Sequence, residues 1–180
     1  MLSSASRKEL GEFRHAKYNF LLANALFKLR RFTEALNILS QELEISKDKT
    51  GWEIGLRTLK IMTLVEMGKH SEAELSVLAL REFFKYTDKK IRESENNATP
   101  ISKRDRMILN LLMQAYRKGF MFATLNGKSE KNISILSNNK EQQWEPFTHE
   151  VIPFHEWFVG KMGKKKKEAV AKKQVVRTDN

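Results

Sequence analysis

The sequence predicts an all-α protein built from tandem antiparallel helical hairpins, an α-solenoid closed near its C-terminal end by an aromatic capping helix. The stretch 18–43 holds two apolar stripes with the 3.6-residue period of a buried-face helix, separated by the basic pair Arg30-Arg31. The first stripe is Leu22, Ala23, Leu26 and Leu29. A weaker copy of this stretch returns 38 residues later and pairs Leu26 with Leu64. A hairpin that recurs at a period of roughly 30 to 45 residues is typical of a solenoid, in which each hairpin buries its face on its neighbours.

The first hairpin has a characteristic order of large and small residues. It places a leucine before a small residue at Leu22-Ala23, a large residue at Leu26, and an alanine and a leucine after the turn at Ala35 and Leu39. Small residues let paired helices approach closely, and the large ones fill the seam between them. In this pattern the stretch from about 18 to 84 resembles tetratricopeptide repeats (TPRs), so a TPR-like solenoid is expected. A generic bundle of α-hairpins is the alternative.

Composition agrees with one helical domain over 1–162, followed by a basic, flexible tail over 163–180. The chain has 180 residues, few glycines and prolines, and 33 Lys and Arg against 22 Asp and Glu, for a net charge of +11. It has no cysteine, which excludes disulfides, thiolate metal ligands and a cysteine nucleophile. No apolar run approaches the roughly 18 residues that cross a bilayer. The expected location is therefore cytoplasmic.

Three hairpins account for the domain in order. They are expected at about 7–45 and 52–86, with a third, degenerate hairpin at about 102–162. Their helices are expected over 7–30, 32–45, 52–67, 71–86 or further, 102–122 and 154–161. The expected N-caps are Thr33 or a residue near it, Ser71 and Ser102. Gly68 is the expected left-handed C-cap of the third helix, and Asn126-Gly127 is the expected end of the fifth.

Two segments leave alternatives open. Residues 87–102 fit either a polar extension of the fourth helix followed by a loop, which is preferred, or a loop throughout, because the residue before Pro100 is biased away from helix. Residues 128–143 are rich in Asn, Ser and Lys around one apolar triplet, and they fit a short helix or a mobile loop.

Aromatic residues gather after this segment and are framed by two prolines. They are Trp144, Phe147, Phe154, Trp157 and Phe158. A solenoid must cover the apolar face of its last repeat, so this cluster is expected to form a structural cap rather than a ligand pocket.

No catalytic constellation is present. The four histidines are scattered, no glycine-rich loop could cradle a phosphate, and the acid pairs Glu42/Glu44 and Glu93/Glu95 lie among lysines as on exposed helix faces. The sequence therefore predicts a protein that is not an enzyme and has no cofactor, no metal site and no small-molecule substrate.

The TPR resemblance implies that a protein or peptide partner binds in a groove on the face opposite the packing leucines. Carried onto this sequence, the groove positions are Phe20, Asn24, Phe27, Lys28, Thr58, Met62, Val65 and Glu66. The predicted function is thus a non-catalytic protein–protein interaction scaffold that binds a peptide or partner helix. The alternative for Phe20 and Phe27 is that both are simply core residues.

A second function class is association with RNA or the ribosome through the basic tail. From Lys161 onward eight Lys or Arg face only Glu168 and Asp179, which supplies +6 of the net charge. Such a tail binds phosphates without reading sequence, and its affinity falls steeply with salt. The candidate polyanion-binding residues are Lys164, Lys165, Lys166, Lys167, Lys172 and Lys173, with help from Arg30, Arg31, Arg104 and Arg106.

Overall fold

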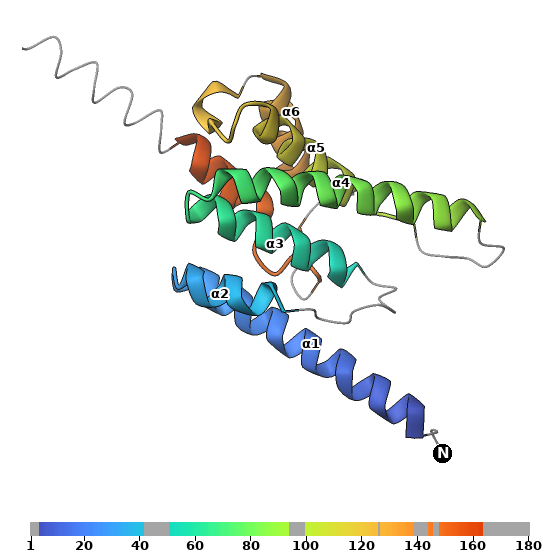
Figure 1. The fold of residues 1–180 in the computed structure, drawn as a ribbon. Helices are drawn as coiled ribbons and strands as arrows, with labels where there is room; N and C mark the ends of the chain where they lie inside the picture. Colours follow the sequence, from blue (N-terminus) through green and yellow to red (C-terminus); the bar gives the residue numbers. More distant parts are fainter. Residues whose placement is uncertain are drawn as a thin grey trace, which may run out of the picture. The chain divides into compact units, whose positions relative to one another are not determined.

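The structure is a computed structural model that describes residues 4–41, 51–93, 100–125, 127–138, 144–145 and 148–163, with side chains from Arg14 onward. Over these ranges the chain forms seven α-helices and one short 3-10 helix, without a strand (Figure 1). The helices are α1 (Ser4–Lys28), α2 (Phe32–Leu39), α3 (Trp52–Glu66), α4 (His70–Glu93), α5 (Lys103–Arg117), α6 (Gly127–Asn138) and a helix at 154–163, with η1 at Phe122–Thr124. The all-α prediction is confirmed. None of the described helices is both long and apolar enough to cross a membrane.

The chain divides into two compact units. The first unit comprises Met1–Ser102 and Pro146–Val151, and the second comprises Lys103–Glu145 and Ile152–Asn180. The chain therefore passes from the first unit to the second, returns for a short segment, and leaves again. The single domain predicted for 1–162 stays a prediction.

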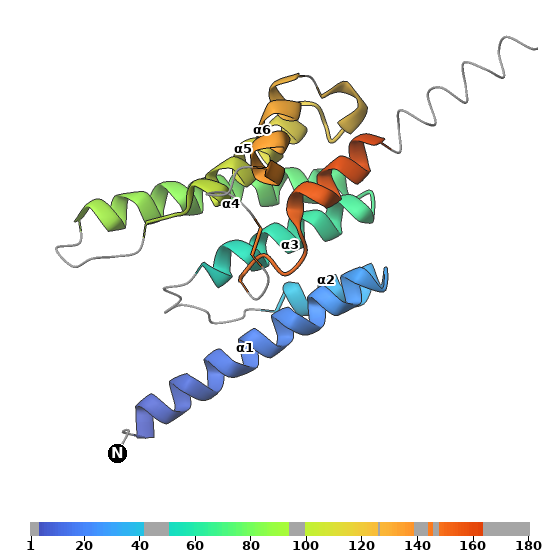
Figure 2. The ribbon, with the colours of Figure 1, turned by 180° about the vertical axis from the view of Figure 1, so that it is seen from behind.

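The first unit is built from helices that pack mainly with their neighbours in sequence. The α1 helix packs on α2, α2 on α3, and α3 on α4, while α1 also touches α3. Figures 1 and 2 show α3 and α4 side by side from opposite directions. Sequential pairing of this kind is what the hairpin pattern of the sequence predicts.

The α3 helix is the most deeply buried element of the first unit. Eleven of the fourteen residues from 52 to 65 are buried, and the other three, Glu53, Arg57 and Lys60, form one half-buried charged strip. A helix with so wide an apolar face belongs in a core. The hydroxyl of Thr63 is satisfied inside the helix, because its Oγ1 donates to the carbonyl oxygen of Leu59 at 2.7 Å.

A segment from far along the sequence, residues 148–151, lies against the start of α3 (Figure 2). Here α3 carries Gly55, and a Cβ at this position would overlap the carbonyl oxygen of His149 and lie 3.0 Å from its carbonyl carbon. At Gly51, φ is +85° and a Cβ would lie 3.1 Å from Nδ1 of the same histidine. Because Gly51 and Gly55 have no side chains, His149 can lie directly against the start of α3.

The turns of the two hairpins have the same hydrogen bonds. After α1, Arg30 has a φ of 61° and the Arg31 amide donates to the Leu26 carbonyl at 2.9 Å. After α3, Gly68 has a φ of 72° and the Lys69 amide donates to the carbonyl of Leu64 at 2.9 Å. This is the Schellman arrangement, which satisfies the last carbonyls of a helix through a left-handed residue. The C-cap predicted at Gly68 is confirmed.

The second unit contains a buried aromatic cluster. Phe122 of η1 makes edge-to-face contacts with Trp157 and Phe158, at centroid distances of 5.9 and 5.2 Å, and Phe154 lies 5.5 Å from Phe158. Phe120 lies next to Phe122 in the same core. The predicted cluster near the 154–163 helix is thus present, with two phenylalanines added from the segment after α5. Trp144 is half-buried, and Phe147 lies outside the described residues.

A guanidinium group ties the second unit together. Arg104 of α5 donates through Nη1 to the Leu136 carbonyl at the end of α6, at 3.0 Å. Its Nη2 lies 3.2 Å from Nδ1 of His155 on the 154–163 helix. Since this side chain links α5 to two other elements of its own unit, it is poorly placed to serve the polyanion binding considered for it above.

Several predicted helix ends need correction. The fifth helix ends at Arg117 rather than near Phe122, and Asn126-Gly127 does not end it, since Gly127 begins α6. Thr33 lies inside α2, whose N-cap position is Arg31, so the expected threonine cap is wrong.

The α4 helix begins at His70, so Ser71 lies inside it and the expected serine cap is wrong, but the helix continues to Glu93. That extension confirms the preferred alternative for the start of 87–102. The α6 helix realises the helical alternative for 128–143, and the 154–163 helix confirms the one expected at 154–161. The expected end of the second helix at residue 45 lies outside the described residues.

We predict that Gly55→Ala destabilises the protein although alanine is the better helix former. The added Cβ meets backbone atoms that no side-chain rotation can move, so the change should lower the unfolding free energy by about 1–3 kcal/mol. The matched control is Gly160→Ala in the 154–163 helix, where nothing lies within 4 Å of the new Cβ and a gain of about 0.5–1 kcal/mol is expected. Urea denaturation of both variants measures the difference, and equal gains would contradict the close approach of 148–151.

We also predict that Ala35→Leu overpacks the first hairpin. Ala35 is fully buried on α2, so three extra heavy atoms should cost about 1–3 kcal/mol. The control is Ala79→Leu on the exposed face of α4, which should change the unfolding free energy by less than about 0.5 kcal/mol. Thermal and urea melts of the two variants decide the matter, and a stable Ala35→Leu protein would show that α2 is not seated as described.

Candidate protein-binding surface

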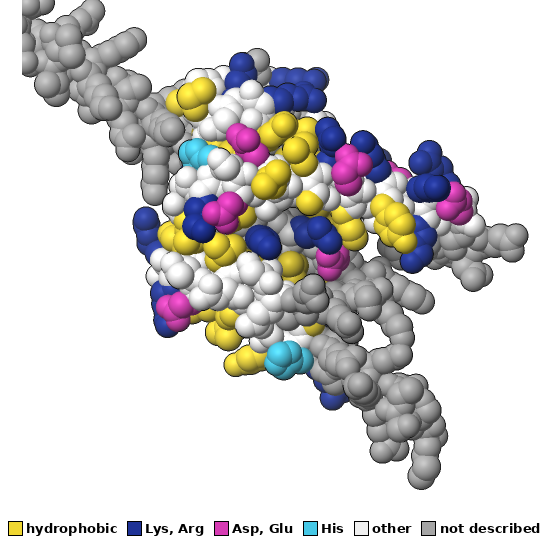
Figure 3. All heavy atoms as spheres, viewed as in Figure 1, with side chains coloured by type: hydrophobic (Ala, Val, Ile, Leu, Met, Phe, Trp, Pro, Cys, Tyr) yellow, Lys and Arg dark blue, Asp and Glu magenta, His cyan; other side chains and the backbone are white. Residues whose placement is uncertain are grey.

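The outward face of α1 is apolar. Tyr18, Leu22, Ala25 and Leu29 follow one another at intervals of four, three and four residues, so they line one side of the helix, with Leu21 beside them. Tyr18 is 65% exposed, Leu29 68% and Leu22 38%. We call these five residues the outer stripe. Figure 3 shows hydrophobic side chains at the surface of the α1–α2 hairpin.

The opposite face of α1 repeats the same spacing and is buried. Ala16, Phe20, Ala23 and Phe27 lie in the core of the first unit. The Phe20 ring meets the ring of Trp52 edge to face, with centroids 5.6 Å apart. Because the inward face is already satisfied, the outer stripe is a second apolar surface that nothing in the described part of the chain covers.

The stripe is flanked by positive charge. From Arg14 to Thr33 the sequence has Arg14, Lys17, Lys28, Arg30 and Arg31 and no acidic residue, and all five cations are exposed. Arginine and lysine on an exposed helix keep their charge in water while their stems border the apolar strip. The outward side of α1 therefore combines apolar side chains with an unbalanced positive field.

Two of the five cations are engaged within the first unit. The Lys17 ammonium lies 4.7 Å from the ring centroid of Trp52. Arg31 pairs with Glu34, whose Oε1 accepts from Nε at 2.6 Å, and this contact raises the pKa of Arg31 and lowers that of Glu34. Arg14, Lys28 and Arg30 make no ion pair within the residues whose side chains are placed, so their charge is available to a partner.

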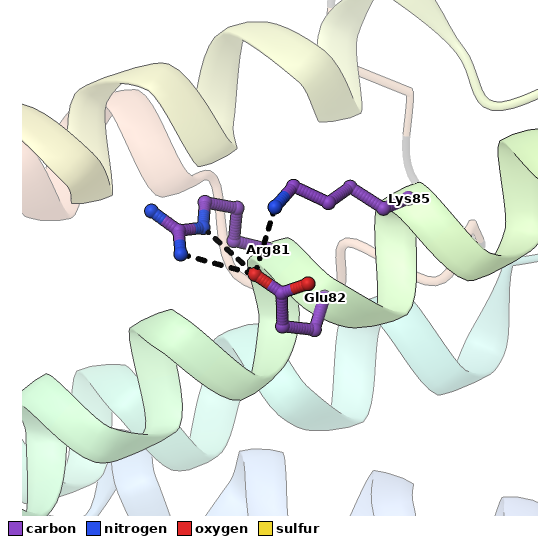
Figure 4. Close-up of polar contacts among 3 residues, drawn as sticks. All are labelled: Arg81, Glu82 and Lys85. Carbon is purple, nitrogen blue, oxygen red and sulfur yellow. Dashed lines mark hydrogen bonds and ion pairs between the residues drawn. The ribbon is translucent and has the colours of Figure 1, made fainter.

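The outer face of α4 is different in kind. Leu75 is 69% exposed there, but acids and bases lie close together further along the helix. Figure 4 shows one such group, in which Oε1 of Glu82 accepts from Arg81 Nη2 at 3.0 Å and from Lys85 Nζ at 3.0 Å. These hydrogen bonds, Lys85 first and Arg81 second, hold the pKa of Glu82 below its ordinary value. Because its positive and negative charges balance, this face would not attract a partner of either charge.

Most residues predicted for the groove lie in the core. The buried ones are Phe20, Asn24, Phe27, Thr58, Met62 and Val65. The amide Nδ2 of Asn24 donates to the Phe20 carbonyl at 2.8 Å, so it is engaged within α1. Of the other two, Glu66 is half-buried and Lys28 is exposed. The core alternative for Phe20 and Phe27 describes where the structure places them, and a partner groove at these positions stays a prediction.

Only half of the residues expected to form the buried face of α1 are buried. Ala23 and Leu26 are buried as expected, whereas Leu22 and Leu29 point outward. The sequence reasoning missed Tyr18, Leu21 and Ala25 as surface candidates. The available signal was that two apolar rows, 16-20-23-27 and 18-22-25-29, share the same spacing on opposite sides of one helix.

The tail lysines and the histidines form no candidate site among the residues that the structure describes. The six tail lysines from Lys164 to Lys173 lie outside the described residues. Across the placed side chains no three His, Asp or Glu residues gather as ligands for a metal ion. His155 instead lies beside Arg104, as described above.

Comparison with known proteins adds no assignment, since no protein-family model, curated protein or solved structure matches this chain.

We predict that Lys85→Gln raises the pKa of Glu82. The hydrogen bond from Lys85 is the first cause of the depressed value, and a neutral glutamine can offer only the weaker hydrogen bond of an uncharged donor. Because the pKa is lowered by folding, the stability that this carboxylate contributes is present above its unfolded pKa and is lost as the pH falls through its folded pKa. NMR titration of the Glu82 side chain measures the shift. Lys128→Gln, in the other unit, is the control that should leave the titration unchanged.

Proposed function

We propose that this protein is a non-catalytic interaction scaffold made of TPR-like helical hairpins, which binds a peptide or helix of a partner protein. The outer stripe carries the proposal. Contiguous exposed apolar side chains on a folded surface mark interaction sites far more often than isolated ones do. The stripe has the i, i+4, i+7, i+11 spacing by which one helix presents its side chains to another.

The TPR-like part of the proposal is supported by the equivalence of the two hairpins. Their turns, 38 residues apart, have a left-handed residue at the same position, Arg30 and Gly68, and the same closing hydrogen bond. The alanine that follows each turn, Ala35 or Ala73, is fully buried. In a solenoid each hairpin is stabilised by its neighbours, so a hairpin with an apolar outer face has room for one more packed element.

The proposed binding surface is the outer stripe rather than the groove first predicted. A partner at the groove positions would have to displace core contacts such as Phe20 on Trp52, whereas the stripe is already accessible. The free energy of binding at the stripe would come from burying Tyr18, Leu22 and Leu29, at about 25 cal/mol for each Å² of apolar surface removed from water.

A second candidate function is association with RNA or the ribosome through the tail. The observation that favours it is the run Lys164 to Lys167, part of a segment that holds more than half of the net charge. Binding of this kind depends on phosphate contacts and weakens strongly as salt rises. Association through the apolar stripe should persist at salt concentrations that abolish the tail's contribution, because exposed charges are screened.

We predict that Leu22→Ser with Leu29→Ser removes partner binding without unfolding the protein. The test captures partners from native lysate on the immobilised chain at about 0.1 M and 0.5 M salt. The unaltered chain should retain the same protein at both concentrations, and the double variant should lose it. Leu75→Ser, equally exposed but on α4, should behave like the unaltered chain.

A chain shortened by residues 164–180 separates the two candidates. If capture survives in the double variant but disappears with the tail, and if it disappears at high salt, the protein is a polyanion binder and the scaffold proposal is wrong. Circular dichroism of each variant confirms that the helices are retained.

A further inference from the structure

We infer that the partner element at the outer stripe is an acidic amphipathic helix of another protein. The inference rests on the proposed function and specifies the chemistry of the partner. Two observations carry it, namely the geometry of the stripe and the charge around it.

The geometry favours a helix. From Tyr18 to Leu29 the stripe spans about 16 Å along a convex helical surface. An extended peptide would need either a sheet edge with free backbone groups or a preformed groove. The backbone of α1 is hydrogen-bonded along its own axis and offers no such edge. A second helix with apolar residues three and four apart can instead place its ridge between Leu22, Ala25 and Leu29, as helices do when they pack in pairs. The small side chain of Ala25 at the middle permits a close approach.

The charge selects an acidic partner. The 20 residues from Arg14 to Thr33 carry five cations and no acid, and three of these cations are not engaged in the described part of the first unit. A helix with Glu or Asp on both sides of its apolar row would meet Arg14 near one end and Lys28 near the other. Complementary charge of this kind raises the association rate and excludes wrong partners more than it raises affinity.

A second copy of this chain fits the same surface poorly. An antiparallel pair of α1 helices would bring Lys28 of one copy near Arg14 and Lys17 of the other, and a parallel pair would place identical cations side by side. Both arrangements juxtapose like charges without an acid between them, which costs binding free energy. An anionic membrane surface would satisfy the charge but not the one-helix-wide apolar row, and it is distinguished by the experiment.

The experiment uses three synthetic helical peptides of about 20 residues, a length that covers the stripe with a turn to spare at each end. The first has leucines at intervals of three and four residues with glutamates elsewhere, the second has lysines in place of the glutamates, and the third is the acidic peptide with two central prolines. Fluorescence anisotropy measures the affinity of the full chain for each. We expect the acidic peptide to bind at least about tenfold tighter than the lysine peptide, and the proline peptide to lose binding because it cannot form the helix.

Charge reversal at the stripe provides the decisive comparison. Arg14→Glu with Lys28→Glu should invert the preference between the acidic and lysine peptides. The matched control, Lys118→Glu in the exposed turn after α5, should leave it unchanged. Leu22→Ser with Leu29→Ser should abolish binding of both helical peptides.

Each contrary outcome has its own meaning. If the leucine variants lose their lysate partner but the acidic peptide shows no preference, the scaffold function stands and the acidic helix is wrong. If neither the lysate partner nor any peptide depends on Leu22 and Leu29, the scaffold function fails as well. Sedimentation of the unaltered chain as a dimer that Leu29→Ser dissociates would replace the partner with a second copy. Co-sedimentation with vesicles of phosphatidylserine that requires Leu22 and Leu29, without peptide binding, would replace it with a membrane surface.

Discussion

The burial of most of the surface of α3 is the constraint on which the first unit depends. An ordinary amphipathic helix buries one face against one neighbouring layer, whereas α3 buries side chains against several neighbours. These neighbours, α1, α2, α4 and residues 148–151, all belong to its unit. This demand explains why α3 carries Gly55, where a backbone segment must pass at van der Waals distance, and why the Thr63 hydroxyl bonds to its own helix. It also explains why the ring of Phe20 turns toward Trp52, which commits the phenylalanine face of α1 to the core.

Local signals in the sequence were sufficient for most helices and for one turn. Gly68 could be placed because a glycine after an apolar row is the residue that most readily takes a left-handed conformation. The equivalent turn at Arg30 has no such signal, and only its alignment with Gly68 points to it. The end of α5 was missed because its apolar row continues to Phe120 and Phe122, as a longer helix would require. The ring of Phe122 instead packs on Phe158 of the 154–163 helix. The overlooked signal is Gly119, which has a φ of 55° and takes the left-handed position that Gly68 takes after α3.

The candidate surface was harder to predict than the fold, for a definite reason. Periodicity says that a helix has an apolar face, but α1 has two faces with identical spacing. The choice between the Phe20 row and the Leu22 row is made by tertiary partners, Trp52 and Phe32, whose rings pack edge to face with the phenylalanines. A sequence alone cannot say which row meets these rings. The structure decides for the phenylalanines and thereby leaves the leucines outside.

Because the leucine row faces outward, the exposed stripe lies beside the cations of α1. A bare apolar row on a helix would associate with any other apolar surface, whereas flanking cations oppose contact between copies of the chain and with other basic proteins. Arg14 and Lys28 lie toward opposite ends of the row, so a partner must satisfy both its length and its sign at once. Burial of apolar surface then supplies the binding free energy, and the cations determine which partner helix is bound. If this division of labour holds, salt should slow the association of a true partner much more than it speeds dissociation, since long-range steering is screened while the packed leucines are not.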